Sequence, residues 1–345
     1  MRAAVLRAGQ IVVDEVADPV PGPGQVLVRT LACGICGSDL HFRKHGERMV
    51  EASRAGGVPL RADMSRDIVL GHEFCAEVVE AGPDTYAPEP GTHVVSVPVV
   101  LMGTDLMNPD LVPIGFDNEL PGAYGELMVL SAPLLVPVPN GLDPAHAALT
   151  EPMAVGLHAV NKSGMAPGDA ALVLGCGPVG LSVIAALKGR GTEVIVATDP
   201  SPTRRALATA MGATAVADPS EVTAIEAWRE AGGREPVVIY EAVGIPGMLA
   251  TAMREAPRGT RITVVGVCME PDTIEPIMGI NKELSLQFVL GYDPFMEFAP
   301  TLTEIAEGRL DITPLVTGEV DLDGVADAFD ALADPDQHCK ILIRP

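Results

Sequence analysis

The chain has 345 residues, a formal net charge of −23 at pH 7 and 48% hydrophobic residues. This length is sufficient for two domains, each with its own hydrophobic core. The negative charge argues against nucleic-acid binding, because phosphate contacts require clustered Lys and Arg. No apolar run approaches the about 20 residues that a membrane-spanning helix needs, so we expect no membrane association.

The beginning of the chain and its cysteines favour the cytoplasm. The segment from Met1 to Leu6 runs directly into a strand-like pattern, so we expect no signal peptide. The 6 cysteines are scattered along the chain, which is not the pattern of a disulfide framework.

Residues 1–150 predict an antiparallel, barrel-like domain. Short β-type runs are separated by turns rich in Pro and Gly, at residues 21–24 and 89–91. The predicted strands are residues 3–6, 11–16, 25–32, 74–81, 93–97 and 127–130.

Three segments in this part of the chain carry side chains suited to a metal ion. Cys36 lies in the segment that begins at Cys33, and His72 and Glu73 are adjacent in a second segment. Glu151, at the junction with the second half, is a third candidate. One thiolate, one imidazole and one carboxylate from separate loops would form a three-ligand zinc site with a position open for catalysis.

Each of these residues also has a structural interpretation. Cys33 and Cys36 could form a redox pair or half of a structural zinc site. His72 could be a hydrogen-bonded core histidine, Glu73 a solvated charge at a strand end, and Glu151 a favourable acid at a helix N-terminus. The metal hypothesis therefore depends on their combination with the cofactor motif that follows.

From about residue 153 the pattern changes to alternating apolar strands and helices. This alternation predicts a doubly wound parallel sheet, and the chain as a whole is of the α/β class. The predicted strands are residues 170–174, 193–198, 214–217, 236–241, 261–267 and 284–290.

The turn after the first of these strands predicts a dinucleotide-binding site. Residues 175–180 read G-x-G-x-x-G and precede a helix-like segment at 181–188. Gly175 would permit the tight turn, Gly177 would let the backbone approach a pyrophosphate, and Gly180 would let the helix pack closely on the strand. The phosphates would lie at the N-terminus of that helix. A purely structural strand–turn–helix is the alternative.

Asp199 ends the second of these strands, at the distance from Gly180 where an acid accepts both ribose hydroxyls of an adenosine. Its charge favours NAD over NADP, because it would repel a 2′-phosphate. Arg204 and Arg205 are close enough in the sequence to weaken this preference.

Taken together, the motifs resemble those of the zinc-dependent alcohol dehydrogenases of the medium-chain dehydrogenase/reductase superfamily. The resemblance rests on residues 34–41, on Gly71-His72-Glu73, on Glu151-Pro152 and on the glycine turn, in the same order over essentially the whole chain. It implies a GroES-like β-barrel catalytic domain of residues 1–152 and 293–345 and a Rossmann NAD-binding domain of residues 153–292. The branch that it resembles includes the sorbitol, butanediol and threonine dehydrogenases.

The resemblance also implies the metal ligands. Cys36 and His72 would bind the zinc ion, and Glu151 occupies the position that is often Glu or Asp in polyol and secondary-alcohol enzymes. Glu73 would be a direct ligand or an alternate one during ligand exchange, so the choice between Glu73 and Glu151 stays open. Asp39 would accept a hydrogen bond from the His72 ring and orient it.

In the same pattern, Cys33 is not a ligand, and Ser38 and His41 form a proton relay. Ser38 would take the alcohol proton and pass it through the nicotinamide ribose to His41, whose ordinary pKa lies near neutrality. A bound zinc ion would lower the pKa of the alcohol.

The resemblance assigns cofactor contacts to Gly175, Gly177, Pro178, Val179, Gly180, Asp199, Arg204, Val265 and Lys340. Lys340 would reach either Glu73 or the pyrophosphate, and a surface lysine is the alternative.

Two features depart from the family pattern. Members with a structural zinc carry four closely spaced cysteines in the lobe that spans about residues 98–121 here, and this chain has none there. We therefore expect one zinc ion per subunit and an irregular path for the lobe. Residues 43–67 look like an insertion near the mouth of the substrate cleft, either a lid or a surface decoration.

The expected activity is reversible oxidation of a small-molecule alcohol to a ketone or aldehyde with NAD, with secondary alcohols, diols and polyols favoured. A zinc-free quinone or enoyl reductase of the same superfamily is one alternative, and it predicts that Cys36, His72 and Glu151 do not converge. A nicotinamide-binding protein without turnover is another. The resemblance implies a homodimer or homotetramer, in which the strand at about 284–290 pairs with its counterpart.

Overall fold

The computed structural model describes residues 1–58, 60–102, 110–235 and 237–345, and the chain divides into two compact units. The first unit contains Met1–Glu151, Val316–Ala333 and Lys340–Pro345, and the second contains Pro152–Leu315 and Asp334–Cys339. The predicted domains differ from these units at the return of the chain, because residues 293–315 lie with the second unit.

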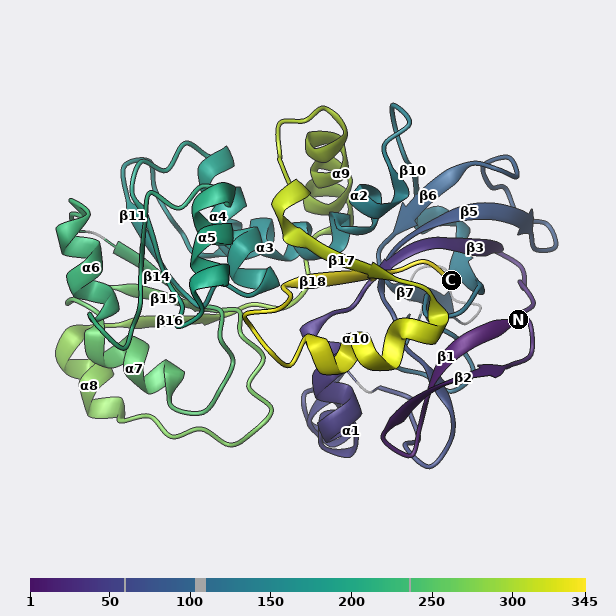
Figure 1. The fold of residues 1–345 in the computed structure, drawn as a ribbon, viewed down its shortest axis with the longest axis horizontal. Helices are drawn as coiled ribbons and strands as arrows, with labels where there is room; N and C mark the ends of the chain where they lie inside the picture. Colours follow the sequence, from purple (N-terminus) through teal and green to yellow (C-terminus); the bar gives the residue numbers. More distant parts are fainter. Residues whose placement is uncertain (59, 103–109, 236) are drawn as a thin grey trace. The chain divides into compact units, whose positions relative to one another are not determined.

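The main sheet of the first unit has the strand order β10-β6-β5-β3-β18-β17, and β9 also pairs with β3. Its strands are β3 (Gln25–Gly34), β5 (Glu73–Ala81), β6 (His93–Ser96), β9 (Leu127–Ser131), β10 (Leu135–Pro137), β17 (Val316–Val320) and β18 (Lys340–Ile343). The pairings are antiparallel, as predicted, except that β17 and β18 are parallel. The pairing of β18 (yellow in Figure 1) with β3 (purple) joins the C-terminal part of the chain to its beginning.

Two smaller sheets complete the strands of this unit among the described residues. One has the order β2-β1-β4 and the other pairs β7 with β8. Their strands are β1 (Arg2–Arg7), β2 (Gln10–Glu15), β4 (Ile68–Val69), β7 (Val99–Met102) and β8 (Asp110–Pro113). The predicted irregular path of the lobe at 98–121 is therefore wrong for the part that forms β7 and β8, whereas residues 103–109 lie outside the described residues.

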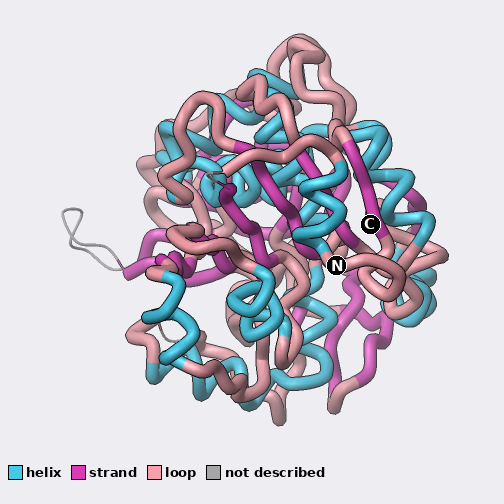
Figure 2. Tube along the Cα trace, turned by 90° about the vertical axis from the view of Figure 1, so that its left-hand side faces the viewer, coloured by secondary structure: helices cyan, strands magenta, loops and turns pink. Residues whose placement is uncertain are grey.

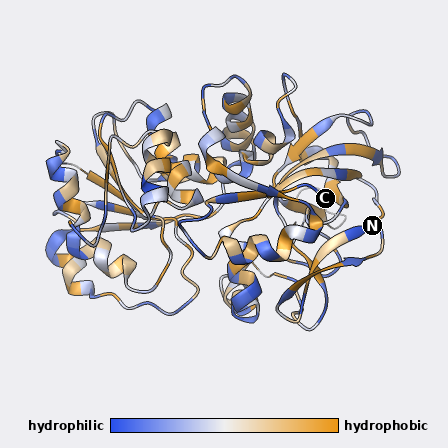
Figure 3. Cartoon of the chain, viewed as in Figure 1, coloured by the Kyte–Doolittle hydropathy of each residue, from blue (hydrophilic) through white to orange (hydrophobic). Residues whose placement is uncertain are grey.

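The strands of the first unit surround a hydrophobic core. Val26 and Val28 on β3 are completely buried, whereas Arg29 on the same strand is exposed. In Figure 3 the strands of this unit carry both hydrophobic (orange) and hydrophilic (blue) residues. This mixture is expected for strands that turn one face to a core.

Helix α1 (Gly37–Ala55) extends well into the segment that the sequence suggested as an insertion. The remainder of that segment is attached to the unit by its polar side chains. The Asn118 side chain bonds with the backbone of Asp63 and of Asp67, and Arg66 donates to Glu119 at 2.5 Å. These contacts favour a fixed surface segment over a lid. The other helices of the unit are α2 (Pro144–Ala148) and α10 (Val325–Ala331).

The second unit contains a parallel sheet with the order β13-β12-β11-β14-β15-β16. Its strands are β11 (Ala170–Leu174), β12 (Ile195–Thr198), β13 (Ala215–Ala217), β14 (Val237–Glu241), β15 (Arg261–Val264) and β16 (Ser285–Phe288). The order reverses between β11 and β14, which is the point where ligands bind in sheets of this type. The predicted doubly wound sheet is confirmed, and only Pro236 of the predicted strands lies outside the described residues.

The helices of this unit alternate with its strands, as the cyan and magenta segments of Figure 2 show. They are α3 (Thr150–Lys162), α4 (Pro178–Gly189), α5 (Pro202–Met211), α6 (Ala224–Glu230), α7 (Met248–Glu255), α8 (Pro276–Lys282) and α9 (Ala299–Ala306). Among the described residues, none of the helices has the length and apolarity needed to traverse a bilayer.

Candidate active site

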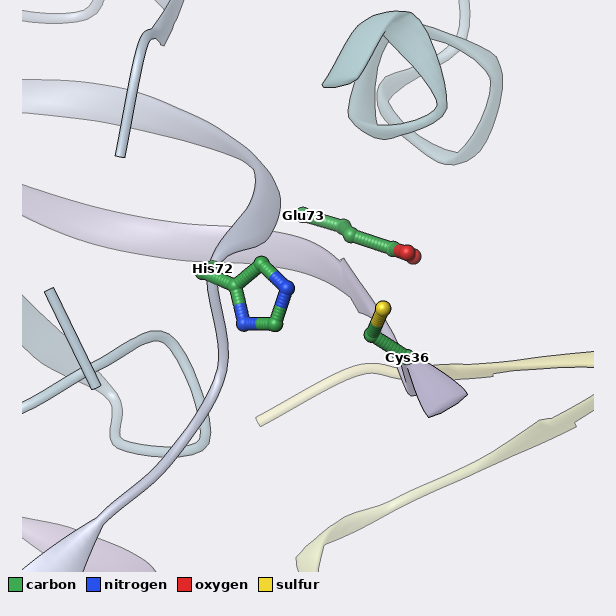
Figure 4. Close-up of side chains that lie close together, drawn as sticks. All are labelled: Cys36, His72 and Glu73. Carbon is green, nitrogen blue, oxygen red and sulfur yellow. The ribbon is translucent and has the colours of Figure 1, made fainter. Parts of the chain in front are cut away.

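Cys36, His72 and Glu73 converge in the first unit. Their potential ligand atoms all lie within 4.8 Å of one another, and Figure 4 shows the three side chains directed toward one another. The antiparallel register of β3 and β5 places Gly34 opposite Glu73, so the segment after β3 meets the segment before β5. Cys36 then lies at the N-cap of α1. The zinc-free alternative predicted that Cys36, His72 and Glu151 do not converge. Cys36 and His72 do converge, whereas Glu151 is not in the group.

Glu73 is buried and forms an ion pair with Lys340. The Lys340 Nζ atom donates to both carboxylate oxygens of Glu73, at 2.7 and 2.6 Å, and to the carbonyl oxygen of Ile35 at 3.0 Å. Glu73 is 1% exposed and Lys340 is 0% exposed, so each charge depends on the other for compensation. Lys340 therefore contacts Glu73, as the resemblance implied, and the alternative of a surface lysine is wrong.

Asp39 lies behind the converging residues and is completely buried. Its Oδ2 atom accepts hydrogen bonds from the Cys36 backbone N–H at 3.0 Å and from the Tyr124 hydroxyl at 2.7 Å. Burial acts to raise the pKa of Asp39, but the nearby His72 ring and the donated hydrogen bonds outweigh burial and lower the pKa overall. Asp39 is therefore a carboxylate.

The His72 ring faces this carboxylate. Its Nδ1 atom is 3.4 Å from Asp39 Oδ1, and its Nε2 atom is 3.3 Å from Ser38 Oγ. Burial acts to lower the pKa of His72, but the charge of Asp39 raises it well above the ordinary value.

These residues fit a zinc ion. Among the described residues, the buried His72 Nδ1 and Asp39 Oδ1 atoms have no partner with hydrogen-bond geometry. A histidine that binds a metal through Nε2 carries its proton on Nδ1, and Asp39 is placed to accept that proton's hydrogen bond. Thiolate, imidazole and carboxylate are the ligands of catalytic zinc sites.

The other residues predicted for the site are Ser38, His41 and Glu151, and they differ in how they lie relative to the converging group. Ser38 is adjacent to the His72 ring, and His41 is half-buried on the same helix, α1. Glu151 is in the first turn of α3 and is not part of the converging group. The ligand role of Glu151 and the proton relay of Ser38 and His41 stay predictions.

The glycine turn of the second unit is tightly packed at Gly175 and Gly180 and has space for a ligand at Gly177. Gly175 has a φ of +92°, and a Cβ atom on Gly180 would overlap the carbonyl oxygen of Gly175. A Cβ atom on Gly177, by contrast, would meet only the guanidinium of Arg204, at 4.0 Å. Helix α4 begins directly after Gly177, which is its N-cap and has no side chain to occupy the free N–H groups.

Asp199 is buried beside this turn. Its carboxylate accepts the Cys176 backbone N–H at 2.8 Å and the Ser201 backbone N–H at 2.9 Å. A carboxylate has about four acceptor sites, so two remain for ribose hydroxyls. Arg205 pairs with Asp218 at 2.9 Å, whereas the buried Nε atom of Arg204 has no partner among the described residues.

The cofactor roles of the predicted residues stay predictions. This applies to Gly175, Gly177, Pro178, Val179, Gly180, Asp199, Arg204, Val265 and Lys340.

One residue at the site, Tyr124, was not identified from the sequence. A buried tyrosine needs a hydrogen-bond partner for its hydroxyl, but its burial follows from tertiary packing that no local pattern reveals.

Comparison with known proteins agrees with both units. Residues 22–140 match the family model for the alcohol dehydrogenase GroES-like domain, and residues 178–307 match that for zinc-binding dehydrogenases. The chain is 33% identical to (R,R)-butanediol dehydrogenase of Bacillus subtilis in an alignment of 341 positions that covers 96% of each protein. It is 28% identical to sorbitol dehydrogenase of the same species in an alignment of 357 positions, gaps included, that covers 100% of this chain and 97% of that one.

A solved structure described as a zinc-binding dehydrogenase from Sinorhizobium meliloti, bound to NADP, has a TM-score of 0.82 and 29% identity. The comparison covers 100% of this chain and 99% of that chain. The predicted fold, a GroES-like domain with a Rossmann-type parallel sheet, is confirmed.

We predict that Cys36→Ser removes zinc and alcohol oxidation but leaves NADH binding intact, because the thiolate is lost from the metal site and the glycine turn is unchanged. Zinc content by mass spectrometry and NADH fluorescence titration measure the two effects. The matched control is Cys33→Ala, which removes the other thiol of the same segment and should retain zinc. Retained zinc in the Cys36 variant would exclude this cysteine as a ligand.

Proposed function

The chain belongs to the alcohol dehydrogenases of the medium-chain dehydrogenase/reductase superfamily, and we propose that it oxidises secondary alcohols, vicinal diols or polyols with zinc and NAD. In this reaction a hydride moves from the carbinol carbon to the nicotinamide, and the hydroxyl proton is released. The observation that carries the proposal is the convergence of Cys36, His72 and Glu73 in a chain that also has a dinucleotide-type turn.

The metal would be held by the Cys36 thiolate, the His72 imidazole and one carboxylate. A bound zinc ion supplies a Lewis acid that polarises the alcohol oxygen and lowers its pKa. We propose Glu151 as the third ligand, because the Lys340 ammonium already neutralises the Glu73 carboxylate, so its charge competes with a metal ion there. Glu73 would then serve as an alternate ligand. We propose one zinc ion per chain, since residues 98–121 contain no cysteine.

Three further side chains would orient the ligand and move the proton. Asp39 faces the His72 Nδ1 atom and favours the tautomer that leaves Nε2 for the metal. Ser38 lies beside Nε2 and would accept the alcohol proton. Burial, followed by the charges of His45 and Lys44, lowers the pKa of His41 below its ordinary value. His41 is therefore neutral at pH 7 and able to accept a proton.

We propose NAD as the cofactor, although the Sinorhizobium structure is bound to NADP. The support is the place of Asp199, which directly follows β12 and contacts the glycine turn through Cys176. A carboxylate there accepts ribose hydroxyls and repels a 2′-phosphate. Arg205, which could attract such a phosphate, is paired with Asp218.

The substrate class follows from the chemistry that the relatives share. Butanediol with two stereocentres and sorbitol both present a secondary alcohol next to a second hydroxyl group. We therefore propose a vicinal diol or polyol in which one secondary hydroxyl is oxidised.

A panel of alcohols tests this proposal. We predict kcat/KM at least about tenfold higher for (R,R)-2,3-butanediol or sorbitol than for 1,4-butanediol, because a site built for a neighbouring hydroxyl rejects a substrate that lacks it. The 1,4-isomer is the matched control, with the same atoms and only primary, separated hydroxyls. NADH formation is the measurement. Tight NADH binding without turnover on any alcohol would favour a non-catalytic protein, and quinone or enone reduction that survives chelation would favour a zinc-free reductase.

We predict that Asp199→Ser raises the ratio of kcat/KM with NADP to kcat/KM with NAD by about tenfold, a change of about 1.4 kcal/mol. The reason is the loss of the charge that repels the 2′-phosphate. Asp199→Asn, which keeps the shape and one acceptor oxygen, should change the ratio in the same direction. A wild-type enzyme that already prefers NADP would show that Asp199 does not select the cofactor.

We also propose that the chain forms a homodimer or homotetramer through β16. Among the described residues, this strand pairs only with β15, so its other edge is open. Phe288 is 64% exposed and Leu290 is 84% exposed, and on the preceding helix α8 Ile277 and Ile280 are 58% and 70% exposed. An open edge with exposed apolar side chains favours pairing with a second copy about a twofold axis.

Light scattering during size exclusion tests the assembly. We predict a mass of two or four chains for the wild type and a smaller mass for the double variant Phe288→Lys with Leu290→Lys, because charge opposes burial of the edge. Val20→Lys is the control, since Val20 is 85% exposed in the first unit and should not affect assembly. A wild-type mass of a single chain would contradict the proposal.

A further inference from the structure

We infer that Tyr124 is a positioning residue of the metal site, which acts through Asp39 to fix the His72 ring. This inference rests on the proposed zinc site. Tyr124 is completely buried, and its hydroxyl donates to Asp39 Oδ2 at 2.7 Å. The Tyr124 hydroxyl touches no proposed metal ligand, so any effect of this hydroxyl on the metal passes through the Asp39 carboxylate.

The hydroxyl of Tyr124 determines which oxygen of Asp39 faces the ring. The Oδ2 atom is held by two donors, the Tyr124 hydroxyl and the Cys36 backbone N–H at 3.0 Å. The Oδ1 atom is thereby directed at His72 Nδ1, 3.4 Å away. Loss of the hydroxyl would leave Oδ2 with one donor, and the carboxylate could rotate away from the ring.

Tyr124 also positions the backbone that carries His72. Three consecutive N–H groups, those of Gly122, Ala123 and Tyr124, donate to the carbonyl oxygens of residues 69, 71 and 70, at 2.8, 3.0 and 3.0 Å respectively. These carbonyl groups belong to the residues immediately before His72. The segment around Tyr124 therefore forms a short ladder of backbone hydrogen bonds with the three residues that precede His72.

The Tyr124 ring packs directly on Gly71. Gly71 has a φ of +102°, and a Cβ atom there would lie 2.5 Å from the ring atom Cδ1 of Tyr124. A side chain at position 71 would thus displace the ring and strain the backbone. The glycine before His72 is explained by this contact, and the ring limits where the His72 backbone can lie.

The Tyr124 ring also makes an aromatic contact. Tyr124 and Phe329 make an edge-to-face contact with centroids 6.1 Å apart, and the guanidinium of Arg43 lies 5.4 Å from the Phe329 ring centroid. Burial, and then the Asp39 charge, raises the pKa of Tyr124 well above its ordinary value, so the hydroxyl stays protonated and donates. A rigid ring with an obligate donor is suited to orient a carboxylate.

The experiment is Tyr124→Phe, which removes one oxygen atom and keeps the ring against Gly71 and Phe329. We expect zinc affinity, measured by competition with a chromophoric chelator, to fall about 10–100-fold, the range for partners that orient a metal-bound histidine. We also expect the visible absorption of the Co²⁺-substituted protein to change, because the His72 ring turns relative to the metal.

The matched control is Tyr240→Phe. Tyr240 is also completely buried, and its hydroxyl donates to Ser163 Oγ at 2.9 Å in the second unit. This variant loses a buried tyrosine hydrogen bond that involves none of the residues of the metal site, so it should lower the melting temperature and leave zinc affinity and the Co²⁺ spectrum unchanged.

A double-mutant cycle with Asp39→Asn tests the route of the effect. If Tyr124 acts through Asp39, the double variant loses no more zinc affinity than Asp39→Asn alone. Additive losses would overturn this route. A Tyr124→Phe protein with wild-type zinc affinity and an unchanged Co²⁺ spectrum would overturn the inference while leaving the proposed function in place. A wild-type protein that binds no zinc would overturn both.

Discussion

Two buried carboxylates lie at the site, Glu73 within the converging group and Asp39 behind it, and burial of a charge is costly unless a partner compensates it. Asp39 is compensated by His72 and by hydrogen bonds from the Cys36 backbone and the Tyr124 hydroxyl. Glu73 is compensated by Lys340. Because each carboxylate needs its partners, the segments that supply them must meet at one place, and this requirement brings the potential metal ligands together.

The need to compensate the Glu73 charge also accounts for the return of the C-terminal strand to the first unit. Lys340 and Glu73 are separated by 267 residues, and the second unit lies between them in the sequence. Strand β18, which carries Lys340, pairs with β3 in the main sheet of the first unit. The C-terminal strand is therefore part of the structure that holds Glu73, and truncation before Lys340 would leave a buried charge without compensation.

The sequence alone was sufficient to predict those elements and site residues that local patterns determine. The glycine turn, its helix and the parallel strands follow from glycine spacing and apolar periodicity, and Cys36 and His72 were identified from their motifs. The length of α1 and the role of Tyr124 were not accessible in this way, and the contact of Lys340 with Glu73 was suggested only by the resemblance. Each depends on a partner distant in the sequence: Tyr124 and Asp39 are 85 residues apart, and no local pattern encodes that contact. The boundary at residue 293 came from the resemblance, whereas the first unit resumes at Val316.

The most direct test of the account is the zinc content per chain of purified wild-type protein, combined with diol oxidation before chelation, after chelation and after zinc is restored. The account predicts one zinc ion per chain, loss of oxidation on its removal and recovery on its return. Oxidation that persists in protein shown to be free of zinc would contradict the account, and two zinc ions per chain would contradict the absence of a structural site.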